Sequence, residues 1–259
     1  MASGCFPKTN LISLVFATRK DETISIVTNK EELPTEEDNL IYKAAKLVMT
    51  EAGKRIGLDI ELKKRIPMAA GMAGGSTDAA QTMIAVNEIL GEPFSVRELM
   101  EMAVRIGADV PYCIMGKTAL AEGIGEVLTP LPAPPGAHIL IAKPPIDVST
   151  KYVYEHLKWD RIKEHPDIDR MIRGLESSDL EIICQSMGNV LESVTEKKYK
   201  VITRIKDKCK EDSAMQALMS GSGPTVFGVF VNRHDAVMAA EEIKAKKWAK
   251  EVYVTGFKN

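Results

Sequence analysis

The chain has 259 residues, of which 45% are hydrophobic and 27% charged, the composition of an ordinary soluble globular protein. Its formal net charge of −2 gives no electrostatic reason to expect nucleic acid or a membrane surface as partner. No apolar run approaches the ~20 residues of a membrane-spanning helix, and the first residues lack a signal-peptide pattern. We expect a cytoplasmic protein, a monomer or a weak homodimer.

The residue types that bind transition metals are scattered. The histidines form no HxxxH pair, and the cysteines form no CxxC pair. We interpret the cysteines as a reduced, structural set, and we expect any metal to arrive with a phosphate ligand. The four cysteines are Cys5, Cys113, Cys184 and Cys209.

The first half of the chain predicts both strands and helices. A helical pattern begins after Asn39, and Ser95 with Glu98 forms a capping box that predicts a helix to about Ile106. Another helix is expected after the glycine-rich segment that begins at Pro67. The predicted strands cover residues 14–16, 23–27, 60–66, 118–121 and 126–128, and the predicted helices residues 40–48, 76–90 and 95–106.

The segment 131–136 (LPAPPG) is the best linker candidate, because prolines precede a closing glycine. Beyond it, strand and helix patterns alternate, which favours an α+β or α/β fold in two lobes. We predict domains over residues 1–135 and 136–259. The predicted strands of the second cover 138–142, 225–231 and 252–255, and its helices 150–157, 167–175, 179–187, 196–211 and 235–245.

The segment from Pro67 to Asp78 (PMAAGMAGGSTD) joins a predicted strand to a predicted helix. Small residues let a backbone approach an anion closely, and the start of a helix presents unpaired N–H groups to it. Ser76 and Thr77 add hydroxyls suited to phosphate oxygens or to phosphate-bound Mg²⁺. The segment is neither a dinucleotide-binding GxGxxG motif nor a P-loop. The alternative is a tight turn with Ser76 as N-cap.

Two other segments carry candidate polar groups. Asp109, within GADVP (107–111), follows a predicted helix and places a carboxylate in a turn; considered alone, we interpret it as a cap or turn residue rather than a catalytic one. The loop Ser220–Gly223 (SGSG) precedes a predicted strand and is a weak anion-binding signal by itself.

Together the three segments resemble, in order, the three motifs of the GHMP kinases. Within that superfamily, residues 107–131 (GADVPYCIMGKTALAEGIGEVLTPL), 189–195 (NVLESVT) and 144–154 (PPIDVSTKYVY) are similar to the 4-diphosphocytidyl-2-C-methyl-D-erythritol kinases. The resemblance extends over about residues 9 to 257. It implies an α+β, two-lobed GHMP kinase fold, with an N-terminal lobe like domain 2 of ribosomal protein S5 and a ferredoxin-like C-terminal lobe.

The resemblance also implies ATP- and Mg²⁺-dependent phosphorylation of the 2-hydroxyl of the diphosphocytidyl alcohol in the non-mevalonate isoprenoid pathway. Asp109 would take or orient the hydroxyl proton, and Lys64 and Asn39 would lie on the adenosine side. Thr150, Tyr154 and the loop of Ser220, Gly221, Ser222 and Gly223 would lie on the substrate side. The ATP phosphates would lie against Pro67, Met68, Ala69, Ala70, Gly71, Met72, Ala73, Gly74, Gly75, Ser76 and Thr77, with Ser76 also on the metal.

The start of the chain departs from the family pattern. The family opens with A-K-I-N-L, whose lysine pairs with the catalytic aspartate, and G-Y-H follows; G-Y-H does not occur here. Either this chain begins after that segment, which the spacing to Asp38 favours, or Lys8 to Leu11 (KTNL) is a degraded form in which Lys8 is the catalytic lysine. Ser213 and Gln216 also stand where family glycines are expected.

Three other functions therefore stay open. One is a nucleotide-binding pseudokinase with impaired transfer, and another is a GHMP kinase for a different small alcohol. The third is a nucleic-acid-binding module, since part of this fold occurs in ribosomal proteins. Balanced charge and an aromatic content of only 5% disfavour that third function.

Overall fold

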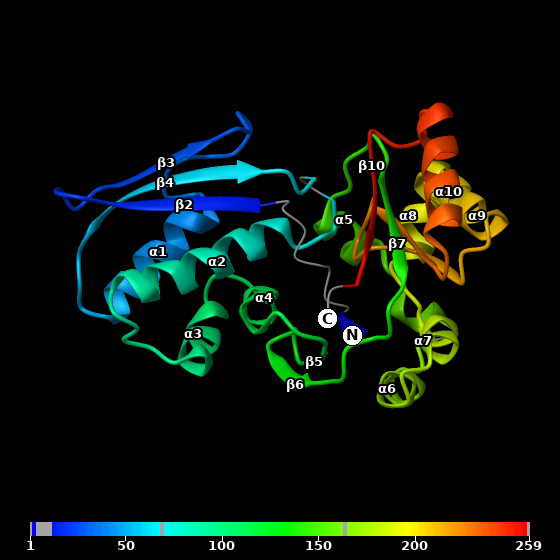
Figure 1. Cartoon of the computed structure of the whole chain (residues 1–259), viewed down its shortest axis with the longest axis horizontal. Helices are drawn as coiled ribbons and strands as arrows, with labels where there is room; N and C mark the ends of the chain where they lie inside the picture. The colour runs from blue at the N-terminus through cyan, green and yellow to red at the C-terminus, as the bar shows by residue number, and fades with distance from the viewer. Residues whose placement is uncertain (1, 4–11, 68–69, 163–164, 258–259) are drawn as a thin grey trace. The chain divides into compact units, whose positions relative to one another are not determined.

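The computed structural model describes residues 2–3, 12–67, 70–162 and 165–257 (Figure 1). The chain divides into two compact units, each with its own hydrophobic core. The first unit contains residues 12–66 and Ala73–Pro130. The second contains Leu131–Asn259, the short segment Pro67–Met72 and the two-residue strand β1 (Ala2–Ser3).

The sheet of the first unit has the strand order β2-β4-β3. The central strand β4 (Gly57–Lys64) pairs antiparallel with β2 (Ile12–Arg19) and parallel with β3 (Ile24–Thr28). Alternate residues of β4 are buried, because successive side chains of a strand point to opposite faces of the sheet. The strand ends at Lys64, directly before the glycine-rich segment.

Helices complete the first unit. In its core, α1 (Leu40–Glu51) packs against α2 (Gly74–Ile89) through buried alanines of both helices. The capping box of Ser95 and Glu98 begins α3 (Val96–Ala103), as predicted. A short helix α4 (Val110–Met115) and the antiparallel pair β5 (Ala119–Glu122) and β6 (Val127–Pro130) follow.

The second unit contains an antiparallel sheet with the strand order β10-β7-β9-β8. Two helices, α9 (Lys200–Glu211) and α10 (Arg233–Ala245), pack on this sheet and bury its apolar side chains (Figure 1). The strands are β7 (His138–Lys143), β8 (Gln216–Met219), β9 (Val226–Phe230) and β10 (Glu251–Gly256).

Shorter helices connect the strands of the second unit. A small apolar cluster holds α6 (Ile168–Glu176) against α7 (Leu180–Ser186). The others are α5 (Thr150–His156), the 3₁₀ turn η1 (Trp159–Arg161) and α8 (Glu192–Lys198). No helix in the described part of the chain is long and apolar enough to cross a membrane.

The α+β class is confirmed, and three predicted features differ in detail. The single helix expected over 196–211 is two helices, because Tyr199 has φ −126° and ψ 86°, outside the helical region. The helix α4 begins where a turn was expected around Asp109. It has only six residues and begins with Val110-Pro111, too short for a hydrophobic period to show. The four-residue strand β8 was missed for the same reason.

The core of the second unit gives a stability prediction. Phe230 is fully buried, whereas the next residue, Val231, is 60% exposed. Phe230→Ala should lower the free energy of unfolding by about 3–5 kcal/mol, and Val231→Ala by less than about 0.5 kcal/mol. Urea unfolding followed by tryptophan fluorescence measures this unit alone, because both tryptophans, Trp159 and Trp248, belong to it. Equal losses for the two variants would contradict the assigned core.

Candidate active site

The start of α2 has the geometry of an anion-binding site. Ala73 is the N-cap residue with φ +48°, and no side chain of the described residues caps the helix through a hydrogen bond. A helix leaves its first N–H groups without intrahelical partners and carries a positive dipole end there. An anion can satisfy both. The alternative prediction, that Ser76 is a simple N-cap, is wrong, because Ser76 lies inside the first turn.

A buried ion pair lies beneath this helix start. Lys64 Nζ pairs with Asp78 Oδ2, and the two side chains are 3% and 6% exposed. A Cβ atom added to Gly74 would lie 3.2 Å from Lys64 Nζ, so the ammonium is directly behind the helix start. Burial raises the pKa of Asp78, and the Lys64 ammonium opposes that shift. The pair therefore holds a positive group behind the helix start at which an anion would bind.

The second oxygen of Asp78, Oδ1, is buried and has no hydrogen-bond partner among the described residues. Asp78, which ends the glycine-rich motif, was not among the predicted site residues. The signal that could have found it is a carboxylate in the first turns of a helix, one loop after a lysine that ends a strand.

The helix α4 passes beside the same helix start. Thr77 Oγ1 donates to Ala73 O at 2.9 Å and lies 3.6 Å from Cys113 Sγ. Asp109 is one turn before Cys113 on α4, and the N–H of Cys113 donates to Asp109 O. The Asp109 side chain is exposed and makes no capping hydrogen bond, so helix capping does not occupy its carboxylate. The first unit thus places Lys64 behind the uncapped helix start, and Cys113, one turn after Asp109, beside it.

The second unit holds the other predicted loop. Ser220 Oγ donates to Gly71 O at 2.8 Å, and a Cβ atom on Gly71 would lie 2.3 Å from Ser220 O. Gly71 also has φ +66°, so only glycine fits there. Thr150 Oγ1 and Ser222 Oγ are 2.9 Å apart. The structure therefore groups Gly71, Ser220, Ser222 and Thr150, which the sequence placed in separate motifs.

The other predicted residues differ in what the structure shows. Asn39 caps α1: its Oδ1 accepts from Ile41 N at 2.8 Å and its Nδ2 donates to Pro34 O at 2.6 Å. Tyr154 is 42% exposed and lies one turn after Thr150 on α5. Pro67, Ala70 and Met72 are buried, Gly75 lies in the first turn of α2, and Gly221 and Gly223 lie within the loop Ser220–Gly223. Lys8, Met68 and Ala69 lie outside the described residues.

Comparisons with known proteins identify the family of the chain. The GHMP kinases N terminal domain matches residues 39–117, and the GHMP kinases C terminal domain matches residues 171–250. A 4-diphosphocytidyl-2-C-methyl-D-erythritol kinase from Lachnoclostridium phytofermentans is 50% identical over 234 residues, which cover 90% of this chain and 80% of that protein. The chain belongs to this family of GHMP kinases.

Solved structures of GHMP kinases share the fold. A crystal structure of a 4-(cytidine 5'-diphospho)-2C-methyl-D-erythritol kinase has a TM-score of 0.77 and 27% identity, over 95% of this chain and 85% of the other. The homoserine kinase from Cytophaga hutchinsonii has a TM-score of 0.79 and 20% identity, over 95% and 84%. The second likeness shows the fold alone. The two-lobed GHMP kinase fold expected from the sequence is thereby confirmed.

The buried pair in this GHMP kinase gives a second prediction. Asp78→Ala leaves the Lys64 ammonium buried without a counterion, so the free energy of unfolding should fall by about 3–5 kcal/mol. The double variant Lys64→Met/Asp78→Leu buries no charge and should recover most of that loss. Differential scanning calorimetry of both variants tests this. A single variant as stable as the wild type would contradict the buried pair.

Proposed function

We propose that the chain transfers the γ-phosphoryl group of ATP to the 2-hydroxyl of 4-diphosphocytidyl-2-C-methyl-D-erythritol, in the non-mevalonate route to isoprenoid precursors. The observation that carries the proposal is the uncapped start of α2, which has the Lys64 ammonium behind it and α4, the helix of Asp109, beside it. Membership of the kinase family supports the choice of reaction. Phosphoryl transfer depends mainly on positioning and on charge stabilisation, which such groups supply.

We assign the ATP phosphates to the glycine-rich segment, residues 67–77. Its helix start offers N–H donors, and its small residues let the phosphate oxygens approach the backbone. No three His, Cys, Asp or Glu side chains are grouped to hold a metal within the described ranges. We therefore place Mg²⁺ on the phosphate oxygens of ATP, with the Ser76 hydroxyl beside it. Bound there, Mg²⁺ would neutralise charge on the transferring phosphoryl group.

We assign the proton transfer to Asp109. The oxygen of the substrate hydroxyl attacks the γ-phosphorus, the bond from that phosphorus to the β,γ-bridging oxygen breaks, and ADP leaves. The hydroxyl proton passes to the Asp109 carboxylate, which is exposed and not used as a helix cap. Lys64, held by Asp78, stabilises the phosphate charge from behind the helix start.

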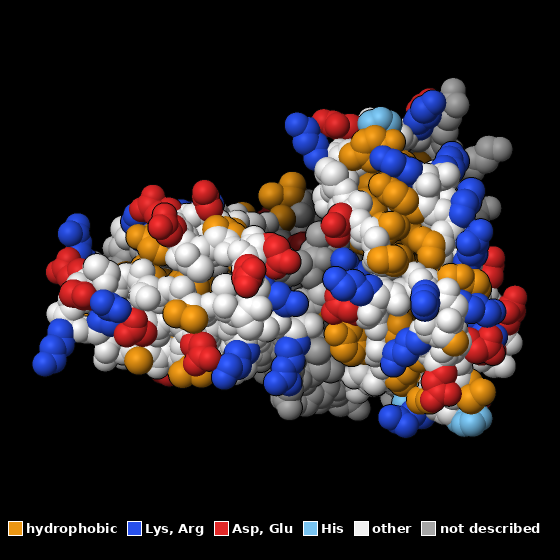
Figure 2. Space-filling model, turned by 90° about the horizontal axis from the view of Figure 1, so that it is seen from above, with side chains coloured by type: hydrophobic (Ala, Val, Ile, Leu, Met, Phe, Trp, Pro, Cys, Tyr) orange, Lys and Arg blue, Asp and Glu red, His pale blue; other side chains and the backbone are white. Residues whose placement is uncertain are grey.

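We assign the substrate to the second unit, beside Thr150, Tyr154 and the loop Ser220–Gly223. Thr150 and Ser222 already share a hydrogen bond, and the serine hydroxyls and backbone groups of the loop suit a polar diphosphocytidyl alcohol. On the face shown in Figure 2, basic and acidic side chains are interspersed and form no broad basic surface. A small-molecule partner therefore fits better than nucleic acid.

Asp109→Asn tests the reaction. The amide keeps the size of the side chain but, unlike the carboxylate, cannot accept the hydroxyl proton. The value of kcat should therefore fall by about 10²–10⁴-fold. The assay is ADP release with Mg-ATP and the diphosphocytidyl substrate. Asp207→Asn, an exposed substitution on α9, is the matched control and should change kcat less than about twofold. ATP binding with no turnover by the wild type would support the pseudokinase alternative instead.

Nucleotide binding at the start of α2 should protect Cys113 from alkylation. Its Sγ lies 3.6 Å from Thr77 Oγ1, in the first turn of the helix that we assign to phosphate. Mass spectrometry of tryptic peptides after iodoacetamide treatment should show slower labelling of Cys113 with ATP present. Cys209 should stay unlabelled either way, because burial raises the pKa of its thiol to about 12. Equal labelling of Cys113 with and without ATP would count against the phosphate assignment.

A further inference from the structure

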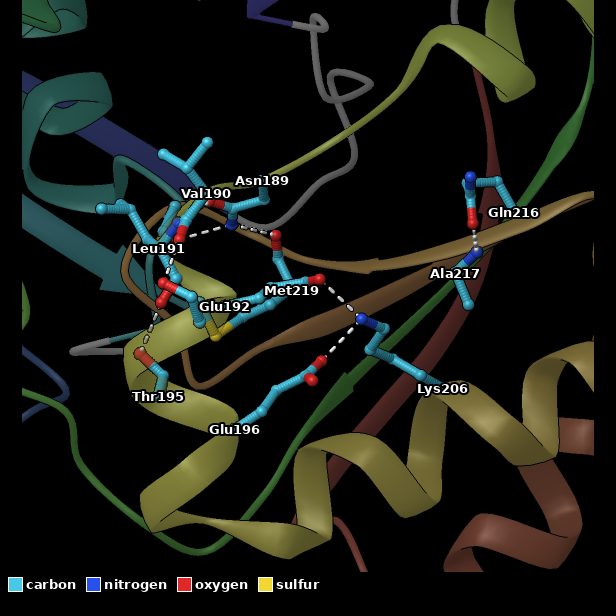
Figure 3. Close-up of polar contacts among 12 residues, drawn as sticks. Asn189, Val190, Leu191, Glu192, Thr195, Glu196, Lys206, Gln216, Ala217 and Met219 are labelled. Atoms are coloured by element: carbon cyan, nitrogen blue, oxygen red, sulfur yellow. Dashed lines mark hydrogen bonds and ion pairs between the residues drawn. The ribbon is translucent and has the colours of Figure 1, made fainter. Parts of the chain in front are cut away.

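The segment 189–195 (NVLESVT) belongs neither to the phosphate-binding segment nor to the loop Ser220–Gly223. It runs from the residues before α8 into the first turn of that helix, and three of its side chains reach the loop Ser220–Gly223 or the residue before it. Figure 3 shows Asn189 and Glu192 directed toward Met219. These contacts lie within the second unit.

Asn189 holds the backbone on both sides of Ser220. Its Nδ2 donates to Met219 O at 2.7 Å and to Gly221 O at 2.8 Å. Its Oδ1 accepts from Leu191 N at 3.0 Å. An amide nitrogen has two hydrogens, and both are directed to the loop here. One side chain therefore holds the carbonyl groups of the two residues on either side of Ser220.

Glu192 binds the backbone N–H of Met219, the residue whose carbonyl Asn189 binds. Its Oε1 accepts from Met219 N at 2.5 Å, while its Oε2 pairs with Lys206 Nζ at 2.6 Å (Figure 3). Lys206 also pairs with Glu196 at 2.6 Å, and its side chain is 13% exposed. Burial raises the pKa of Glu192, and the hydrogen bonds from Lys206 and Met219 oppose that shift. A charge cluster on α8 and α9 thereby anchors the residue before the loop.

Thr195 reaches the far side of the loop. The residue is 2% exposed, and its Oγ1 lies 3.3 Å from Ser222 O. The carbonyls of Met219, Gly221 and Ser222 thus all face donors from one short segment. This backbone geometry directs Ser220 Oγ to Gly71 and Ser222 Oγ to Thr150.

We infer that Asn189, supported by Glu192 and Thr195, is a positioning residue of the phosphoryl transfer. It fixes the loop Ser220–Gly223, and through the Ser220–Gly71 hydrogen bond it also fixes the first part of the phosphate-binding segment. The inference rests on the proposed function of those two loops. A shift of about 1 Å in a positioning element can cost about 10²-fold in rate, so a fixed loop has a catalytic consequence.

Asn189→Asp is the sharpest test. Aspartate keeps the size of the side chain and the acceptor for Leu191 N, but turns an oxygen toward two carbonyl oxygens. We expect kcat/KM to fall by about 10–100-fold at a temperature at which the variant is folded. Hydrogen exchange of the backbone over residues 217–225 should become faster, with or without substrate.

Asn87→Asp is the matched control. Asn87 is buried, its Nδ2 donates to Phe94 O at 2.9 Å, and its Oδ1 accepts from Phe94 N at 3.1 Å. It lies near the far end of α2, about 20 Å from the helix start at 1.5 Å per residue. Asn87→Asp should lower thermal stability as well, yet keep kcat/KM within about twofold of the wild type.

Two variants of Thr195 test the inference if Asn189→Asp does not fold. Thr195→Val removes the hydroxyl and should lower kcat/KM about fivefold, the effect of one ordinary hydrogen bond. Thr195→Ser retains the hydroxyl and should restore most of the activity. Equal activity of the two Thr195 variants would count against the inference.

The outcomes separate the inference from the proposed function. A wild type without turnover would reject the proposed function, and hydrogen exchange over 217–225 would still decide the positioning role. Unchanged exchange in Asn189→Asp, or activity within twofold of the wild type, would overturn the inference. So would an equal loss of activity in Asn87→Asp, because the effect would then be one of stability alone.

Discussion

In the second unit, the backbones of Gly71 and Ser220 approach closely, and this contact constrains the two loops that contain them. Ser220 donates its hydroxyl to Gly71 O, and the space beside Gly71 is too small for any Cβ atom. Two loops that are 149 residues apart in the sequence can pack this closely only if the backbone of each is fixed from elsewhere. For the loop Ser220–Gly223 that support comes from Asn189, Glu192 and Thr195.

In the first unit, a buried ion pair lies behind the start of α2. The N–H groups at the start of α2 can bind an anion, and no side chain in the described part of the chain caps them. Lys64 lies behind the helix start, and Asp78 holds its ammonium in a site from which water is excluded. Removing a charge from water is costly unless a partner compensates for it. The pair therefore places a positive group beneath the predicted phosphate site without leaving it unpaired.

Much of the fold could be predicted from the sequence because its signals are local. The helix start at Asn39, the capping box at Ser95 and the alternating strand that ends at Lys64 each depend on neighbouring residues. The helix α4 and the strand β8 were missed because four to six residues carry no readable period.

The candidate site was only partly predictable, for a different reason. The glycine-rich segment, the motif around Asp109 and the loop Ser220–Gly223 have recognisable sequences, so they could be predicted. The roles of Asp78 and Asn189 depend on partners 14 and 30 residues away, Lys64 and Met219, and no local pattern reveals such pairs. Asn39 shows a different case, since its Oδ1 caps α1 and its Nδ2 donates to the nearby carbonyl of Pro34.

The most direct test of the proposed kinase reaction is ³¹P NMR of the wild-type chain with Mg-ATP and 4-diphosphocytidyl-2-C-methyl-D-erythritol. One new phosphomonoester signal should grow in step with ADP while the diphosphate signals of the substrate stay unchanged, and homoserine or mevalonate should give no product. Unchanged ATP, release of inorganic phosphate alone, or faster phosphorylation of homoserine or mevalonate would contradict the proposed reaction.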